Sequence, residues 1–105
     1  EPGSEFCRAA FMIRHIVFFS LKAETDRDAA IARLSDLGTI PGSTVFEVRP
    51  CLKADQFANE IDLVVYGEFP DVAALRAYKQ HPVYDAVTRD VRPTRELRFA
   101  ADIES

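Results

Sequence analysis

The chain has little cysteine, with only two cysteines among 105 residues. Cys7 lies within the first eleven residues and Cys51 is alone in the remainder, so no disulfide framework is expected. This composition favours a reducing compartment, and we expect a cytoplasmic protein. Cys51, in the stretch "RPCLK", has no adjacent histidine or cationic helix start to activate it, which favours an inert strand cysteine over a nucleophile.

Clustered positive charge is also missing. The formal net charge is −4, with 13 Lys and Arg against 17 Asp and Glu, and no block of basic residues occurs. Because phosphate binding needs a cationic face, no nucleic-acid partner and no anionic membrane surface are expected. No apolar run approaches the roughly 20 residues of a membrane helix. The apolar stretch at residues 16–21 is too short for a secretory signal.

Motifs for metal or phosphate binding are absent from the sequence. The two histidines, His15 and His81, lie far apart, and no HxxxH or CxxC pattern or suitably spaced carboxylate accompanies them. The four glycines form no phosphate-binding loop. We therefore expect no metal and no cofactor.

The first eleven residues, "EPGSEFCRAAF", mix Pro, Gly, Ser and charge without any period. They precede Met12, the only methionine, and are interpreted as an expression tag or linker. Residues 12–105 are then expected to form a single domain, since 48% of the chain is hydrophobic and 29% is charged. A domain of this size buries about 60–68% of its unfolded surface, so oligomerisation is expected to stabilise it.

Alternating β-branched and aromatic residues predict four strands. These are expected at residues 13–22, 44–52, 61–69 and 94–103. Pro50, near the end of the second strand, indicates an edge or a bulge there. The fourth strand closes the chain.

Two helical regions separate the strands. The first is expected to begin at an N-cap on Thr25 or Asp26, to run for about three turns, and to stop at Gly38. The second is capped by Asp71 and should break at His81, because the following proline disfavours helical backbone before it. A new helix starts at that proline.

The order β-α-β-β-α-β is that of the ferredoxin-like split βαβ arrangement, an α+β fold with an antiparallel four-stranded sheet and helices on one face. The second helical region should bury Val72, Leu75 and Tyr78. The helix that starts at the proline should bury the valines that recur along one of its sides. Alternation places Ile16 and Phe18 on the face of the first strand opposite its other apolar residues. Since such a sheet usually has one wet face, a partner's sheet is expected to cover this second face.

Three stretches together resemble a known family. They are "HIVFFSLK" on the first strand, "IPG" after the first helix, and "FPDVAALRAYKQHPVY" near the second. In order and spacing they resemble the Dabb family, the stress-responsive dimeric α/β-barrel domain, over residues 12–103. The resemblance implies a homodimer whose sheets pack face to face into a dimeric α/β barrel, with a pocket between sheet and helices. A small hydrophobic or aromatic ligand is expected in this pocket, whose lining would include Val17, Phe19, Leu21 and Leu75.

A polyketide-cyclase branch of that family implies a mechanism. In it, a Tyr-x-x-His-Pro-x-His motif supplies an acid/base pair for a poly-β-keto substrate, and a strand-one histidine faces the same cavity. By this resemblance the tyrosine corresponds to Tyr78, the middle histidine to His81 and the strand-one histidine to His15. The final histidine, the general base of that branch, corresponds to Tyr84. A tyrosine, with an ordinary pKa of about 10, is a poor base at pH 7 but can donate a hydrogen bond to a carbonyl oxygen.

The same side chains also permit structural roles. His15 is either a buried neutral imidazole satisfied by hydrogen bonds or an orienting or basic residue in a pocket. His81, at a helix start whose dipole disfavours the imidazolium form, is either a proton acceptor or a simple cap. Tyr78 and Tyr84 lie three residues either side of it and would converge with it if the two helices were coaxial. Otherwise they are amphipathic core residues.

Arginines recur at every third residue near the C-terminus: Arg89, Arg92, Arg95 and Arg98. They permit a clamp for an anionic ligand. The interleaved Asp90 and Glu96 favour a solvated, salt-bridged surface instead.

These observations leave two classes of function and a more distant third. The first is a cofactor-independent lyase, cyclase or isomerase acting on an enolisable carbonyl or phenolic compound. The second is a stress-related or accessory dimer that holds a small hydrophobic ligand without catalysis. The third is a cofactor-free monooxygenase of the related barrel fold.

Overall fold

The computed structural model describes residues 12–57 and 59–105, so the tag expected at residues 1–11 lies outside the described residues. Its strands form one antiparallel sheet in the order β2-β3-β1-β4. In chain order these are β1 (Ile13–Leu21), β2 (Val45–Pro50), β3 (Leu63–Phe69) and β4 (Arg95–Glu104). The predicted ferredoxin-like α+β arrangement is confirmed, with strand ends shifted by one or two residues.

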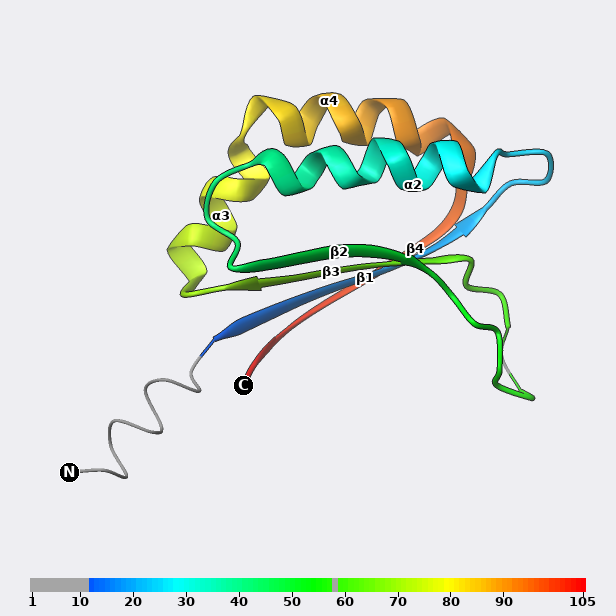
Figure 1. Ribbon diagram of the computed structural model, residues 1–105, viewed down its shortest axis with the longest axis horizontal. Helices are drawn as coiled ribbons and strands as arrows, with labels where there is room; N and C mark the ends of the chain where they lie inside the picture. The colour runs from blue at the N-terminus through cyan, green and yellow to red at the C-terminus, as the bar shows by residue number, and fades with distance from the viewer. Residues whose placement is uncertain (1–11, 58) are drawn as a thin grey trace.

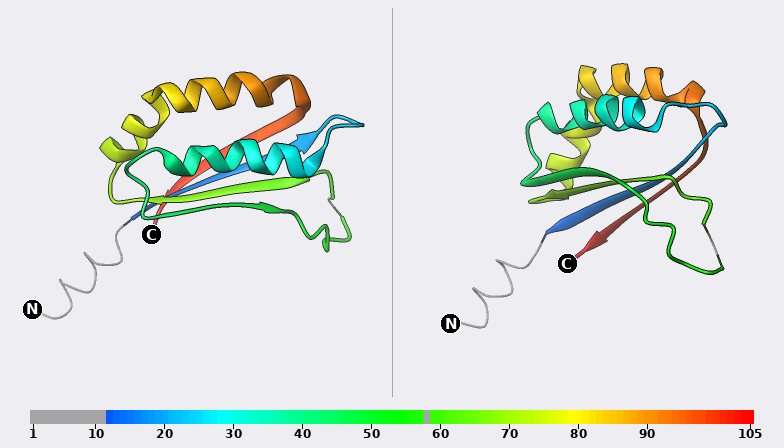
Figure 2. Two further views of the ribbon diagram at one scale, coloured as in Figure 1. Left: turned by 45° about the horizontal axis from the view of Figure 1, so that its top comes forward. Right: turned by 45° about the vertical axis from the view of Figure 1, so that its right-hand side comes forward.

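The helices all lie on one face of this sheet (Figure 1). They are α2 (Arg27–Ser35), α3 (Val72–Gln80) and α4 (Pro82–Val91), with short 3₁₀ turns η1 (Asp36–Thr39) and η2 (Arg92–Thr94) after α2 and α4. The two turned views in Figure 2 show the opposite face of the sheet left uncovered. None of the helices in the described part of the chain has the length and apolar character needed to cross a bilayer.

Helix α2 begins at Asp26, whose carboxylate accepts a hydrogen bond from the Ala29 backbone N–H at 3.1 Å. Of the two predicted caps, Asp26 is therefore the one used. The predicted stop at Gly38 is wrong, because the chain continues through it as η1. A Cβ atom at position 38 would lie 3.0 Å from the Phe46 ring, so the glycine here permits a close approach of β2.

The predicted helix break at His81 is confirmed. Its backbone is extended (φ −69°, ψ 141°), and Pro82 starts α4. As Figure 1 shows, α3 runs at an angle to α4, so the two helices are not coaxial. Leu75 and Tyr78 of α3 are buried as predicted, whereas Val72, in the first turn, is 43% exposed.

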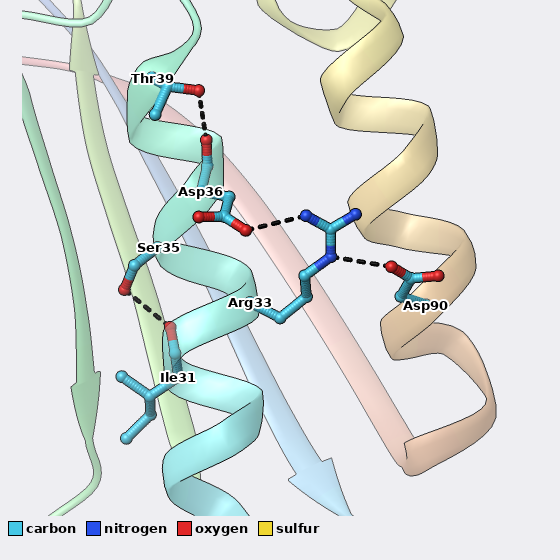
Figure 3. A network of polar contacts seen from close by, with 6 residues as sticks. All are labelled: Ile31, Arg33, Ser35, Asp36, Thr39 and Asp90. Carbon is cyan, nitrogen blue, oxygen red and sulfur yellow. Dashed lines mark hydrogen bonds and ion pairs between the residues drawn. The ribbon is translucent and has the colours of Figure 1, made fainter.

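The core lies between the sheet and the helices. Alternate residues of β1 point into it, including Val17 and Phe19, and they meet Leu63 and Val65 of β3. Above them, Arg33 of α2 donates hydrogen bonds to Asp90 of α4 and to Asp36, both at 2.8 Å (Figure 3). These exposed ion pairs contribute little energy each, but they link α2 to α4 over one end of the core.

The uncovered face of the sheet is apolar at its centre. Phe18 of β1 is aligned with Val64 of β3 on one side and with Phe99 of β4 on the other. Phe99 is 56% exposed and Ile103 is 47% exposed. The prediction that β1 is apolar on both faces is confirmed, and in this chain alone nothing in the described residues covers the second face.

Candidate functional site

A small cavity lies between the sheet and the helices. Its volume is about 30 Å³, measured to the centre of a water-sized sphere. A single water needs roughly 10–15 Å³ by that measure, so the cavity accommodates only a few atoms in this conformation. Its lining comprises His15, Val17, Phe19, Leu34, Leu37, Val65, Tyr78, Tyr84, Val87, Thr88, Val91, Arg95 and Arg98.

His15 is the polar residue that β1 contributes to this cavity. It is 1% exposed, and its Nδ1 lies 2.5 Å from Oδ1 of Asp102. Asp102 is aligned with His15 in the β1–β4 register, so both side chains point to the helix-covered face. An ionised carboxylate can only accept a hydrogen bond, so the His15 proton lies on Nδ1, which donates a hydrogen bond to Asp102. The other nitrogen, Nε2, is then unprotonated in the neutral ring.

Burial lowers the pKa of His15 below its ordinary value of 6.5. The hydrogen bond and the negative charge of Asp102 act in the opposite direction, while the positive charges of Lys79 and Arg98 add to the lowering. Lys79 Nζ itself lies 3.6 Å from Asp102 Oδ2, which ties the carboxylate to α3 as well as to β1. At neutral pH the imidazole is therefore neutral and able to accept a proton.

Tyr78 lies beside His15, and Tyr84 lies beside Tyr78. The Tyr78 ring centroid lies 5.9 Å from that of His15 and 5.2 Å from that of Tyr84, both in edge-to-face geometry. Burial raises the pKa of the Tyr78 phenol well above its ordinary value, and the neighbouring Tyr84 raises it further. The Tyr78 phenol thus keeps its proton at physiological pH and is able to donate a hydrogen bond.

His81 lies outside the residues that line the cavity. Its Nδ1 accepts a hydrogen bond from the Val83 backbone N–H at 3.1 Å and so caps α4. Of the two roles that the sequence left open, proton acceptor or cap, the structure displays the cap. The convergence of all three rings required coaxial helices, and the angle between α3 and α4 brings together only Tyr78 and Tyr84.

The four apolar residues expected in the pocket divide in two. Val17 and Phe19 line the cavity, whereas Leu21 and Leu75 do not. Leu75 is buried in the core from α3, and Leu21 packs at its margin. Leu21 is the last residue of β1 and lies beyond the point where the β1–β4 register shifts.

The sequence analysis missed Asp102 and did not place Arg95 and Arg98 at a cavity. Residues 98, 100 and 102 alternate on one face of β4, which was a usable signal. Which β1 residue each of them would oppose depends on the register of strands some 80 residues apart in sequence, and alternation alone does not fix that register. In the described part of the chain, no group of three or more His, Cys, Asp or Glu side chains is arranged to hold a metal ion.

Residues 13–105 match the family model described as the stress responsive A/B barrel domain, Dabb. The chain belongs to the Dabb family. No curated protein matches this Dabb domain. The match covers all the elements that build the cavity, from β1 to β4.

Several solved structures share the fold of this Dabb protein. A Dabb family protein with a ferredoxin-like fold from Mesorhizobium loti is 28% identical, with a TM-score of 0.73 over 89% of this chain and 95% of that one. A dimeric ferredoxin-like protein of unknown function from Jannaschia sp. CCS1 is 26% identical, with a TM-score of 0.76 over 90% and 99%. A hydroxynitrile lyase from Passiflora edulis is 19% identical, with a TM-score of 0.79 over 91% and 94%. This last likeness concerns the fold alone.

Proposed function

We propose that this Dabb protein is a cofactor-independent acid/base enzyme of the lyase, cyclase or isomerase type, acting on a small enolisable carbonyl or phenolic compound. The observation that carries the proposal is His15: a buried, neutral imidazole whose Nδ1 is held by Asp102 at 2.5 Å, on the wall of a cavity shared with two tyrosines. A histidine oriented by a carboxylate is a common arrangement for a general base.

The chemistry follows from the two nitrogen atoms and the phenols. His15 Nε2 would take a proton from the carbon next to a carbonyl, and the C–H electrons would move onto the carbonyl oxygen as an enolate. The phenol of Tyr78 would donate a hydrogen bond to that oxygen. Tyr84, whose ring contacts that of Tyr78, would be a second donor. Asp102 would stabilise the imidazolium until the proton returns. Tyr84 replaces the base of the cyclase branch, so this scheme assigns the base to His15.

The fold is compatible with such chemistry, since a hydroxynitrile lyase shares it. His15 and Tyr78 are also held rigidly, one on a central strand and one at 1% exposure in the core. Rigid elements position reacting groups better than loops do.

The second candidate function is a ligand-binding dimer without catalysis. The small volume of the cavity favours it, because about 30 Å³ leaves little room for a substrate unless Tyr84 or Arg98 moves. The two candidates differ in one measurable property, which is proton transfer.

Exchange of α-protons tests that property without knowledge of the natural substrate. Small ketones from acetone to acetophenone would be incubated with the protein in D₂O and followed by proton NMR. An enzyme should accelerate exchange, and His15→Gln should reduce the acceleration by about 100-fold or more. His81→Asn is the matched control, because it removes the other imidazole but leaves a good N-cap, and it should change the rate less than about twofold.

Two outcomes would overturn catalysis by His15. One is exchange that persists unchanged in His15→Gln. The other is binding of the ketones, seen as shifted cavity resonances, with no exchange for any of them, which would identify a binding protein.

We also propose that two chains form a homodimer by packing the uncovered faces of their sheets together. The apolar centre of that face, around Phe18 and Phe99, supports this, as does the dimeric state named for the Jannaschia protein. Sedimentation equilibrium should give twice the 11.8 kDa of one chain. Phe99→Lys should produce monomers. Leu52→Lys also replaces an exposed apolar residue with lysine, but on the β2–β3 loop, and it should leave the dimer intact. A wild-type monomer at micromolar concentration would contradict the proposal.

A further inference from the structure

Positive side chains line a groove beside the cavity, although the chain as a whole is acidic. A groove of about 340 Å³, by the same measure as the cavity, adjoins it and shares Tyr84, Thr88, Arg95 and Arg98 with it. Lys79 and Arg92 complete the cationic wall of the groove. One ligand could therefore occupy the groove and the cavity at once.

A β-bulge gives two of these arginines the same direction. Residues three apart on a regular strand point to opposite faces. Here Phe19 is aligned with Arg98 and Leu21 with Arg95, because the register shifts by one residue at Glu96. Arg95 and Arg98 consequently lie on the helix-covered face together, and both reach the cavity lining. Bulges are often found next to functional sites, where they redirect a side chain.

The carboxylates near the groove are already engaged with other groups. Asp85, which lies in the groove wall, pairs with Arg89 at 2.6 Å. Asp90 pairs with Arg33 of α2 at 2.8 Å, as Figure 3 shows. Asp102 holds His15 and has Lys79 at 3.6 Å.

Arg92, Arg95 and Arg98 form no salt bridge with any residue in the described part of the chain. The sequence favoured a salt-bridged surface for all four arginines. Among the described residues, Arg89 forms a salt bridge and the other three do not. Burial lowers the pKa of Arg95, and the charges of Arg98 and Arg92 lower it further. Three guanidinium groups without a counter-charge, beside an apolar cavity, favour the binding of an anion.

We propose that this groove binds a carboxylate, so that the substrates of the site are small carbonyl or phenolic acids. The planar guanidinium groups of Arg95 and Arg98 would bind the carboxylate, and the carbonyl or phenolic part would enter the cavity beside His15. The proposal rests on the cavity function proposed above and adds the charge of its ligand.

Binding of two nearly isosteric probes tests the inference with the full chain. 4-Hydroxybenzoate carries the carboxylate, and 4-hydroxybenzamide replaces it with a neutral amide. Calorimetric titration at fixed ionic strength should give an affinity about tenfold higher for the acid, the size expected of a charge-assisted hydrogen bond. Arg98→Gln combined with Arg95→Gln should abolish that preference, so that acid and amide bind with equal affinity.

Arg49→Gln is the control for a general loss of positive charge. Arg49 lies on the edge strand β2, where it pairs with Glu47 at 3.1 Å, and its substitution should leave the acid preference unchanged. Equal affinity for acid and amide in the wild-type protein would overturn the carboxylate site but leave the cavity proposal standing. An acid preference that survives the double substitution would also overturn it. Failure of both probes to bind would overturn the carboxylate site as well, while the exchange experiment decides the cavity proposal separately.

Discussion

His15 and His81 each hold Nδ1 in a hydrogen bond, but with opposite directions of donation. Nδ1 of His15 donates to Asp102 and leaves Nε2 as an acceptor, whereas Nδ1 of His81 accepts from the Val83 backbone and leaves Nε2–H as a donor. The first arrangement suits a base and the second suits a cap. The partner of Nδ1, more than the residue type, separates the two histidines.

The two histidines also differ in burial and in the rigidity of the backbone that holds them. The backbone of His15 lies in a central strand between β3 and β4, and its ring is 1% exposed. His81 sits at a junction between two helices and is half-buried. We therefore expect substitutions at His15 to affect both stability and chemistry, and substitutions at His81 to affect stability through the helix start alone.

The largest effect is expected for His15→Ala. The change removes a buried ring and leaves Asp102 without its partner in the core, so the free energy of unfolding should fall by about 2–3 kcal/mol. Urea unfolding at one fixed protein concentration measures this. A loss of unfolding free energy no greater than that of His81→Ala would show that His15 contributes no more to stability than His81, contrary to this prediction.

Acid should affect the His15 region next. Because the pKa of His15 is lower in the folded protein than its ordinary 6.5, the unfolded chain binds the proton more readily. The stabilisation from the neutral ring is complete above about pH 6.5 and is lost as the pH falls towards the folded pKa, by at most about 1.4 kcal/mol per pH unit. His15→Gln should flatten the stability profile below about pH 6.5, as urea unfolding at a series of pH values measures, and an unchanged slope would contradict this role of the ring.

A smaller effect is expected at the helix junction. His81→Ala removes the side chain that caps α4 and should cost about 0.5–1 kcal/mol, whereas His81→Asn restores a good capping residue and should cost almost nothing. Thermal unfolding of the two variants side by side measures the difference. Equal losses would mean that the hydrogen bond to Val83 is not what stabilises this helix start.

Asp102→Asn keeps the shape of the side chain, and it is chosen for its effect on His15 more than for its effect on stability. Its informative readout is the pKa of His15, because Asp102 provides the hydrogen bond and the negative charge that raise it. Removing that charge should lower the pKa further, as followed by NMR titration of the imidazole Cε1 resonance. A pKa that stays the same or rises would show that Asp102 does not control the ring.

Much of the fold could be predicted because its signals are local. Alternation in β1, the Asp26 and Asp71 caps, and the Pro82 restart of α4 each depend on residues a few positions apart. The stop at Gly38 was predicted wrongly because a glycine that permits a close approach of Phe46 has the same sequence signature as a helix terminator.

The site was less predictable because its members come from distant segments. His15, Tyr78 and Tyr84 were named from the sequence, and all three line the cavity. Asp102 depends on the pairing of β1 with β4, and the role of His81 depends on the angle between α3 and α4. Arg95 and Arg98 depend on a bulge at Glu96 that no turn residue marks. Each of these is a matter of register or orientation, which periodicity leaves open.

The sequence by itself determined the order of the elements, the two apolar faces of β1, and the chemistry available near the cavity, since side-chain spacing and type specify these locally. Only the tertiary structure decided which histidine meets a carboxylate and which meets a backbone N–H. It also decided that, among the residues that the structure describes, Arg92, Arg95 and Arg98 form no salt bridge. The physical reason is that hydrogen bonds and ion pairs form between atoms a few Å apart, and strand register and helix packing set those distances.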